Sequence, residues 1–176
     1  ISASIITVCS SGCNYTLIQS AVNAANNGDV INVFAGIYNE SQIIINKNLN
    51  VIGADSNNTI INGNDATLTD TGLVRIISNG DVIFSGFKLI NAGGPVNTGD
   101  GNDGKTNVGI YAQSINNTAT YIISSNQIYG TNNPNDEQDY GFYSNSGKEN
   151  LIFINNIITQ TGANAILMEL HSGTSD

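Results

Sequence analysis

Short apolar runs separated by glycine, asparagine and aspartate make up most of this chain. Three of them, VIFSGFKLIN (82–91), YIISSNQIYG (121–130) and LIFINNIITQ (151–160), can be written under one another. Large apolar residues then share columns: Ile83, Ile122 and Ile152 in one, Phe84, Ile123 and Phe153 in the next, and Leu89, Ile128 and Ile158 in a third. Runs of this length bounded by turn residues are typical of β-strands. The pattern predicts a repeated pair of strands.

A second family of short strands accompanies these pairs, at GLV (72), GIY (109), GFY (141) and NAIL (164). Successive repeats are separated by roughly 24 to 40 residues, a spacing typical of solenoid proteins. Asn126 and Asn156 share the turn column inside the repeated pair, where their side chains can hydrogen-bond from coil to coil.

These features predict an all-β fold, a single-stranded right-handed parallel β-helix of about five coils with aliphatic columns inside. An antiparallel sandwich is the alternative, but it gives no reason for columns matched across three repeats. A βαβ sheet is excluded because no helices separate the strands.

One segment has a helical period, YTLIQSAVNAANNGD (15–29). Its apolar stripe ends before Gly28, a stop signal, and consists of Leu17, Ile18, Ala21, Val22 and Ala25. We expect a helix over 16–26 that caps the first coil and covers its strand edges. The predicted organisation is an N-terminal strand and cysteine loop over 1–15, then the capping helix and β-helix over 16–176 as one domain.

The stretch DVINVFAGIYNE (29–40) raises a question about Glu40. Its apolar residues Val30, Ile31 and Val33 predict a buried strand, after which Tyr38 is expected to be exposed. Glu40 is then either the first residue of an active site or a turn residue, solvated or bonded to neighbouring backbone. We expect the turn residue.

The charge balance excludes one class of partner. The 176 residues include 14 acidic and 5 basic side chains, which gives a net charge of −9. Nucleic-acid binding needs clustered Lys and Arg, whereas this chain has one Arg and four scattered Lys. Nucleic acid is therefore excluded as a partner, and an anionic polymer would need a bridging cation. No apolar run approaches the roughly 18 residues that span a bilayer.

Two cysteines, Cys9 and Cys13, are either unrelated thiols or a small disulfide loop that holds the N-terminal segment, with Gly12 easing the turn. We expect the disulfide, which implies an oxidising, extracellular or cell-surface location. Candidate glycosylation sites agree with this location, although sequons also arise by chance in so asparagine-rich a chain; they begin at Asn14, Asn39, Asn57 and Asn116.

The segments 16–40 and 49–63 (TLIQSAVNAANNGDVINVFAGIYNE and LNVIGADSNNTIING) resemble the opening of the pectin-lyase-like β-helix superfamily. The resemblance is to archaeal, methanogen-type surface β-helix repeat proteins and, more distantly, to pectin methylesterases, which share a TIQ-type helix and a G-x-Y-x-E motif. It implies the fold more than an activity, because one fold hosts many functions. It also implies that Gly36, Tyr38 and Glu40 belong to a common first coil.

Two long acidic segments, 92–107 and 130–139, follow the second strand of consecutive repeats. Stacked coils would bring them side by side, and oxygen-rich side chains on glycine-rich turns suit Ca²⁺. The candidate ligands are Asp100, Asp103, Asp136 and Asp139, with Glu137 and Asn102 nearby. The alternative is two solvated loops whose acids keep the surface soluble.

Three enzyme classes can be compared with these segments. A pectate-type lyase would need Ca²⁺ ligands and a base, for which Lys88 and Lys105 are available, with Arg75 one coil earlier. A polygalacturonase-type hydrolase would need an Arg-x-Lys element that the chain lacks.

A methylesterase would use Gln138 and Asp139, which resemble that family's Gln-Asp element. The expected second aspartate falls near Asn164, which cannot act as a carboxylate nucleophile, and no arginine follows. If the protein is an enzyme, the candidate catalytic residues are Asp139, Gln138 and Lys88.

Tyr111 and Tyr143 share a column. Facing outward they would stack on sugar rings, and facing inward they would fill the core.

The thin supply of catalytic side chains favours a structural role. We therefore expect a secreted or cell-surface, adhesin-like protein, glycosylated and self-associating head to tail into a filament, sheath or surface layer, with the β-prone residues 1–8 pairing to a neighbour. The alternative is a lyase, an esterase or a carbohydrate-binding module acting on acidic glycans. No cofactor other than Ca²⁺ is expected.

Overall fold

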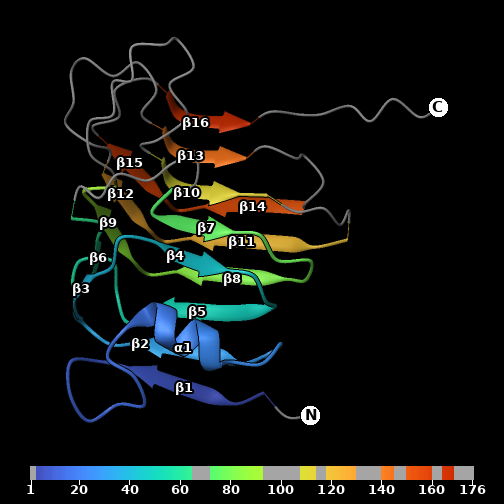
Figure 1. Cartoon of the computed structure of the whole chain (residues 1–176). Coiled ribbons are helices and arrows are strands. Elements are labelled where there is room, and N and C mark those ends of the chain that lie inside the picture. The colour runs from blue at the N-terminus through green and yellow to red at the C-terminus, as the bar shows by residue number, and fades with distance from the viewer. Residues whose placement is uncertain are drawn as a thin grey trace, which may run out of the picture.

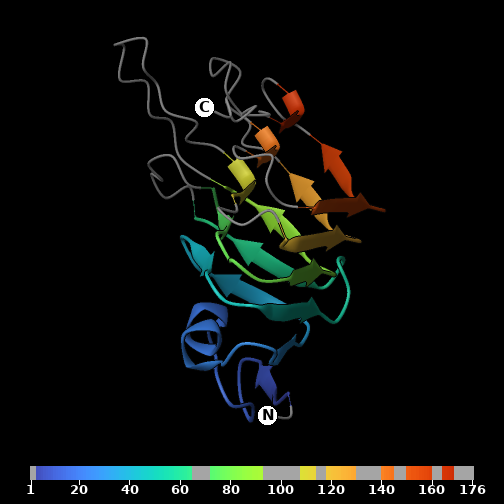
Figure 2. The same ribbon diagram turned by 90° about the vertical axis from the view of Figure 1, so that its right-hand side faces the viewer.

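The chain forms a right-handed parallel β-helix with one short helix at its N-terminal end (Figure 1). The computed structural model describes residues 3–64, 72–92, 108–113, 118–129, 140–144, 150–159 and 164–168. All of the strand pairs in these ranges are parallel, and Figure 2 shows the rungs stacked from the N-terminal end toward β14, β15 and β16. The predicted fold class is confirmed.

Three sheets run along the solenoid, and each coil from β2 onward gives one strand to each sheet, whereas β1 adds a sixth strand to sheet A alone. Sheet A contains β1 (Ile5–Val8), β2 (Val30–Val33), β5 (Leu49–Gly53), β8 (Val82–Ser85), β11 (Thr120–Ser124) and β14 (Asn150–Ile154). Sheet B contains β3 (Gly36–Asn39), β6 (Thr59–Asn62), β9 (Lys88–Ile90), β12 (Gln127–Tyr129) and β15 (Ile157–Thr159). Sheet C contains β4 (Ile43–Ile45), β7 (Val74–Ile76), β10 (Val108–Ala112), β13 (Tyr140–Ser144) and β16 (Asn164–Met168).

The predicted columns are the observed strand register. Phe84 lies opposite Ile123, which lies opposite Phe153, and these side chains fill the interior or pack against it. Leu89, Ile128 and Ile158 pair in the same way in sheet B. In sheet C the first glycine-led strand is shifted by one residue, because Val74 and not Leu73 lies opposite Ile110. Gly72 has φ +67 and precedes the strand.

The predicted asparagine contacts are also present. Asn126 is buried, and its Oδ1 accepts the backbone N–H of Phe87 at 3.0 Å. Its Nδ2 donates to Phe84 O at 3.2 Å and to Asn156 Oδ1 at 3.0 Å. These bonds satisfy buried backbone groups at the corner between sheets A and B, which explains why asparagine recurs there.

The helix α1 (Ile18–Ala24) occupies the place below β4 where sheet C would otherwise continue (Figure 1). Ile18, Ala21, Val22 and Ala25 are buried as expected. Leu17 is not part of the buried stripe: it is extended, 45% exposed, and precedes the helix.

The helix also closes the edge of β4. The Gln19 side-chain amide takes the place of a neighbouring strand, because its Oε1 accepts Ile44 N at 2.6 Å and its Nε2 donates to Ile44 O at 3.4 Å. The expected capping of the strand edge is thus made by one side chain, which leaves the edge of β4 satisfied at Ile44.

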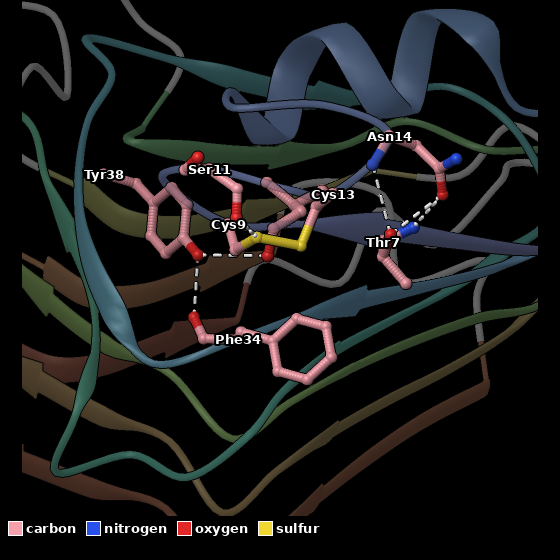
Figure 3. Close-up of a disulfide and its surroundings, with 8 residues drawn as sticks. Thr7, Cys9, Ser11, Cys13, Asn14, Phe34 and Tyr38 are labelled. Atoms are coloured by element: carbon pink, nitrogen blue, oxygen red, sulfur yellow. Dashed lines mark hydrogen bonds between the residues drawn. A yellow bond between two sulfur atoms is a disulfide. The ribbon is translucent and has the colours of Figure 1, made fainter.

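A disulfide joins Cys9 to Cys13, as predicted (Figure 3). The loop returns the chain to β1, since Cys9 N donates to Tyr15 O and Tyr15 N donates to Thr7 O. β1 itself pairs with β2, from Ile5 opposite Val30 to Val8 opposite Val33. Residues 5–8 are therefore the first rung of the chain's own sheet A.

Tyr38 is buried, contrary to the expectation from sequence. Its hydroxyl donates to Phe34 O at 2.7 Å and lies 3.2 Å from Val8 O (Figure 3). Burial, and secondarily the charge of Glu40, raises the pKa of Tyr38. The side chain points inward because it alternates with Ile37, which is 65% exposed.

Candidate functional site

Glu40 binds the N-terminal end of α1. Its Oε1 accepts the backbone N–H of Ile18 at 2.6 Å and its Oε2 accepts that of Gln19 at 2.8 Å. Burial raises the pKa of Glu40, and the two hydrogen bonds oppose that rise. The carboxylate therefore has a structural role, but it is buried rather than solvated, and its backbone partners lie 22 and 21 residues away.

The corner between sheets B and C is where later coils carry the two acidic segments. Residues 93–107 and 130–139 connect β9 to β10 and β12 to β13. The flanking strands are hydrogen-bonded neighbours, so both connections start and end on adjacent rungs. The predicted site residues on them lie outside the described residues, and this applies to Asp100, Asp103, Asp136, Gln138 and Asp139.

The outer face of sheet C lies beside this corner and has an ordered column of side chains. Strand register places Ile44, Arg75, Tyr111 and Tyr143 opposite one another in successive coils. Tyr111 and Tyr143 thus share a column, as predicted, and their ring centroids are 5.4 Å apart.

Arg75 is the polar member of this column and the single arginine of the chain. Its guanidinium carbon lies 5.9 Å from the centroid of the Tyr111 ring. Its Nε is buried and has no hydrogen-bond partner among the described residues. A buried unsatisfied donor is costly and uncommon, so Arg75 stands out as a polar group whose acceptor the described part of the chain does not supply.

The tyrosines form a small apolar cluster separate from the interior. It consists of Val108, Tyr111, Tyr140 and Tyr143, and all four are buried. The Tyr111 hydroxyl donates to Gln113 Oε1 at 3.2 Å. The tyrosine pair therefore lies on the outer face of the sheet without being an exposed platform, and Arg75, half-buried, is its more accessible neighbour.

Lys88 lies on a different sheet from Arg75. It projects outward from β9 in sheet B, where its Nζ is 4.7 Å from the centroid of the Tyr129 ring. Its register neighbours are Ile60 and Gln127. A role for Lys88 as a base is not tested by this placement.

Three of the four predicted glycosylation sequons begin at a described, exposed asparagine. Asn14, Asn39 and Asn57 are exposed, whereas Asn116 lies outside the described residues. Asn14 Oδ1 accepts from Thr7 (Figure 3), and Asn39 Oδ1 accepts from Asn62 Nδ2 at 2.9 Å. Asn57 Oδ1 accepts from Gln127 Nε2 at 2.9 Å. A glycan would be attached to Nδ2, so each of these contacts through Oδ1 can be kept in a glycosylated chain.

Within the described ranges, no group of three or more His, Cys, Asp or Glu side chains is arranged to hold a metal. The Ca²⁺ ligands expected from sequence all lie outside those ranges. In the same ranges, no helix is both long and apolar enough to cross a membrane.

No family model matches the chain, and no curated protein matches its sequence. The fold does match solved structures. A mutant pectin methylesterase in complex with a hexasaccharide has a TM-score of 0.60 and 16% identity, over 97% of this chain and 57% of that one. A second pectin methylesterase in complex with a hexasaccharide has a TM-score of 0.52 and 15% identity, over 88% of this chain and 55% of that one.

The pectin methylesterase PemA from Erwinia chrysanthemi has a TM-score of 0.53 and 16% identity, over 88% of this chain and 55% of that one. The chain therefore spans little more than half the length of these enzymes. Identity at this level shows the shared parallel β-helix fold and no more. The neighbours are pectin-related proteins, as one branch of the sequence resemblance implied, and archaeal surface proteins are not among them.

Proposed function

We propose that this protein recognises an acidic polysaccharide on the outer face of sheet C, with Arg75 binding a uronate carboxylate. The observation that carries the proposal is the buried Nε of Arg75, for which the described residues provide no hydrogen-bond partner. A guanidinium presents paired donors to a carboxylate, and a ligand of this kind would satisfy the orphaned group.

The surroundings of Arg75 support a sugar ligand. The neighbouring Tyr111 ring holds the guanidinium from one side, which limits its freedom before binding. The structurally similar pectin methylesterases include two in complex with hexasaccharides, so this fold can present a surface to an oligosaccharide. The net charge of −9 means that the attraction must be local to Arg75 or assisted by a cation.

Ester hydrolysis at the same face is the reaction we propose to test. Asp139 directly precedes β13, so its carboxylate is the candidate nucleophile on a methyl ester carbonyl, with Gln138 as the candidate donor to the oxyanion. Attack would form an acyl-enzyme anhydride and expel methoxide, which takes a proton from water and leaves as methanol. A water molecule would then hydrolyse the anhydride to the free uronate and the Asp139 carboxylate. Asn164, the first residue of β16, is an asparagine close to where the methylesterase resemblance expects a second aspartate.

Binding and hydrolysis are tested together with three probes: polygalacturonate, methyl-esterified polygalacturonate and a neutral galactan. We expect polygalacturonate to bind, and the methyl-esterified polymer to bind only through the carboxylates it retains. The galactan should bind at least about tenfold more weakly than polygalacturonate, because a carboxylate contact contributes about 1.4 kcal/mol or more. Arg75→Ala should abolish this preference and Arg75→Lys should retain part of it, while Asn32→Ala, on the outer face of sheet A, is the matched control. Equal binding by wild type and Arg75→Ala would refute the proposal.

Two further measurements separate the steps. Methanol release that is lost in Asp139→Asn while binding persists would support hydrolysis, and no release by the wild type would leave recognition alone. Repeating the binding with Ca²⁺ and with EDTA tests the proposed ligands Asp100, Asp103, Asp136 and Asp139, because a bridging cation would make uronate binding sensitive to the chelator.

An extracellular location is part of the proposal. The Cys9–Cys13 disulfide persists in oxidising compartments, and exposed sequons at Asn14 and Asn57 fit a secreted glycoprotein. Expression in a glycosylating host, followed by a mass shift on glycosidase treatment, tests this point.

Self-association into a surface assembly is the second candidate function. It is favoured by a largely aliphatic column on the outer face of sheet A, which is interrupted only at Asn50. Ile5 at one end of this column is 66% exposed and Ile152 at the other is 45% exposed. β1 is the terminal strand of sheet A and pairs with β2 on one side, so assembly would use either this face or the outer edge of β1. Sedimentation velocity of wild type and Ile152→Lys tests it: a monomer in both would remove the candidate.

A further inference from the structure

A cavity of about 400 Å³ lies at the corner where the chain passes from sheet C to sheet A. Three stacked turns line it: Asn27 after α1, residues 46–48 between β4 and β5, and residues 78–80 between β7 and β8. This volume is in the range of small-molecule pockets. The cavity lies on a different corner from the acidic segments, which connect sheet B to sheet C.

Gly80 forms one wall of this cavity. A Cβ at this position would lie 3.0 Å from Asn48 Cβ and 3.4 Å from Asn48 Nδ2. A side chain at position 80 would therefore displace Asn48, and the glycine keeps the Asn48 amide in the lining.

Lys47, the one charged residue in the lining, has no free hydrogen-bond donor. Lys47 Nζ donates to the carbonyl groups of Val22, Asn23 and Ala25 at 3.0, 2.8 and 2.8 Å. An ammonium has three donors, so all are used at the C-terminal end of α1. No carboxylate is among the lining residues. The lining therefore offers an anion no free ammonium donor and offers a metal ion no carboxylate ligand.

The remaining lining is rich in side-chain amides. Asn27 Oδ1 accepts Asn48 N at 3.0 Å, which orients Asn27 and leaves its Nδ2 as a donor. Within the described residues, the side-chain amides of Asn46 and Asn48 make no hydrogen bonds. Each amide offers donors and an acceptor, which is the complement of a hydroxyl group.

We propose that this cavity binds a neutral, hydroxyl-rich saccharide unit through the amides of Asn27, Asn46 and Asn48. Amides around a lysine whose donors are all used favour a polyol over an acidic sugar, because a carboxylate would find no free ammonium donor here. The site is independent of uronate binding at Arg75, and either can exist without the other.

The test is a titration of isotope-labelled protein with cellotetraose, xylotetraose and galactotetraose, followed by amide chemical shifts. We expect at least one of these probes to shift residues 46–48 and 78–80. Asn46→Ala and Asn48→Ala should each weaken that binding by about fivefold or more, as loss of one hydrogen bond predicts. Asn32→Ala and Arg75→Ala are controls that should bind like wild type.

Asn46 is exposed, so its truncation removes a ligand contact without disturbing the core. The spectrum of each variant also reports its folding before any sugar is added. Absence of shifts at this corner with all three probes, or unchanged affinity in both folded variants, would overturn the proposal.

Discussion

The carboxylate of Glu40 lies 2.6 Å from the backbone nitrogen of Ile18 and accepts its hydrogen bond. The helix has no side-chain cap of its own at Leu17, so a residue from the next coil provides the cap. Lys47 caps the C-terminal end of the helix, where its ammonium group donates hydrogen bonds to three carbonyl groups. The negative and positive side chains match the helix dipole, and both fasten α1 to the first coil.

Truncation of Glu40 should destabilise the protein. Glu40→Ala leaves the buried N–H of Ile18 without an acceptor, and we expect a loss of about 1 to 3 kcal/mol in the free energy of unfolding. Glu40→Gln keeps one acceptor oxygen and should lose less. Urea denaturation followed by circular dichroism measures both. Wild-type stability in Glu40→Ala would contradict the capping role.

The pH dependence of stability should distinguish Glu40 from Asp29. Burial raises the folded pKa of Glu40, so the folded state binds more protons, and this contribution is lost as pH rises through the folded pKa. We therefore expect wild type to gain stability relative to Glu40→Gln as pH falls from neutrality through that pKa. Denaturant midpoints of the pair, measured from pH 7 downward, check the sign.

The contribution of Asp29 to the free energy of unfolding should depend on pH in the opposite direction. Hydrogen bonds from the backbone of Asn26 and then of Ser4 lower the pKa of Asp29, so its contribution is present above the unfolded pKa and lost as pH falls through the folded one. The stability difference between wild type and Asp29→Asn should therefore shrink on acidification. A difference that grew at low pH would contradict this assignment.

Removal of the Lys47 ammonium should loosen the helix. Lys47→Met keeps most of the aliphatic stem but leaves three carbonyl groups without their donor, and we expect a loss of about 1 to 2 kcal/mol. Hydrogen exchange should quicken at the amide of Ala25, which donates to Ala21 O, more than in β11. Uniform exchange changes across both would argue against a local role.

Replacing Asn126 should lower the free energy of unfolding more than replacing an exposed asparagine of the solenoid. Asn126→Ala leaves Phe87 N and Phe84 O without their side-chain partner, with an expected loss of about 2 to 4 kcal/mol. Asn39→Ala, which removes an exposed contact to Asn62, is the matched control and should cost under about 1 kcal/mol. Thermal and urea unfolding of both variants measure the difference, and equal losses would refute the distinction.

Loss of the disulfide should be tolerated. The cysteines are 4 residues apart, and closing so short a loop contributes about 2 kcal/mol in the chain-entropy model. The Cys9→Ser, Cys13→Ser double variant should therefore fold with a modestly lower midpoint, since β1 still pairs with β2. Complete unfolding of this variant would show that the N-terminal rung nucleates the solenoid.

The sequence by itself determined the solenoid, because each coil repeats the same local pattern and parallel stacking places like residues together. The columns of Phe84, Ile123 and Phe153 and the contact of Asn126 with Asn156 could be predicted for this reason.

Only the tertiary structure decided the contacts of Glu40, Gln19 and Arg75. Their partners lie tens of residues away, and no local pattern specifies them. The burial of Tyr38 was missed for a related reason: side-chain direction in a strand alternates, and a shift of one residue reverses it. The repeats in the sequence therefore predict how the coils stack, whereas the contacts between the coils and the capping helix follow only from the three-dimensional structure.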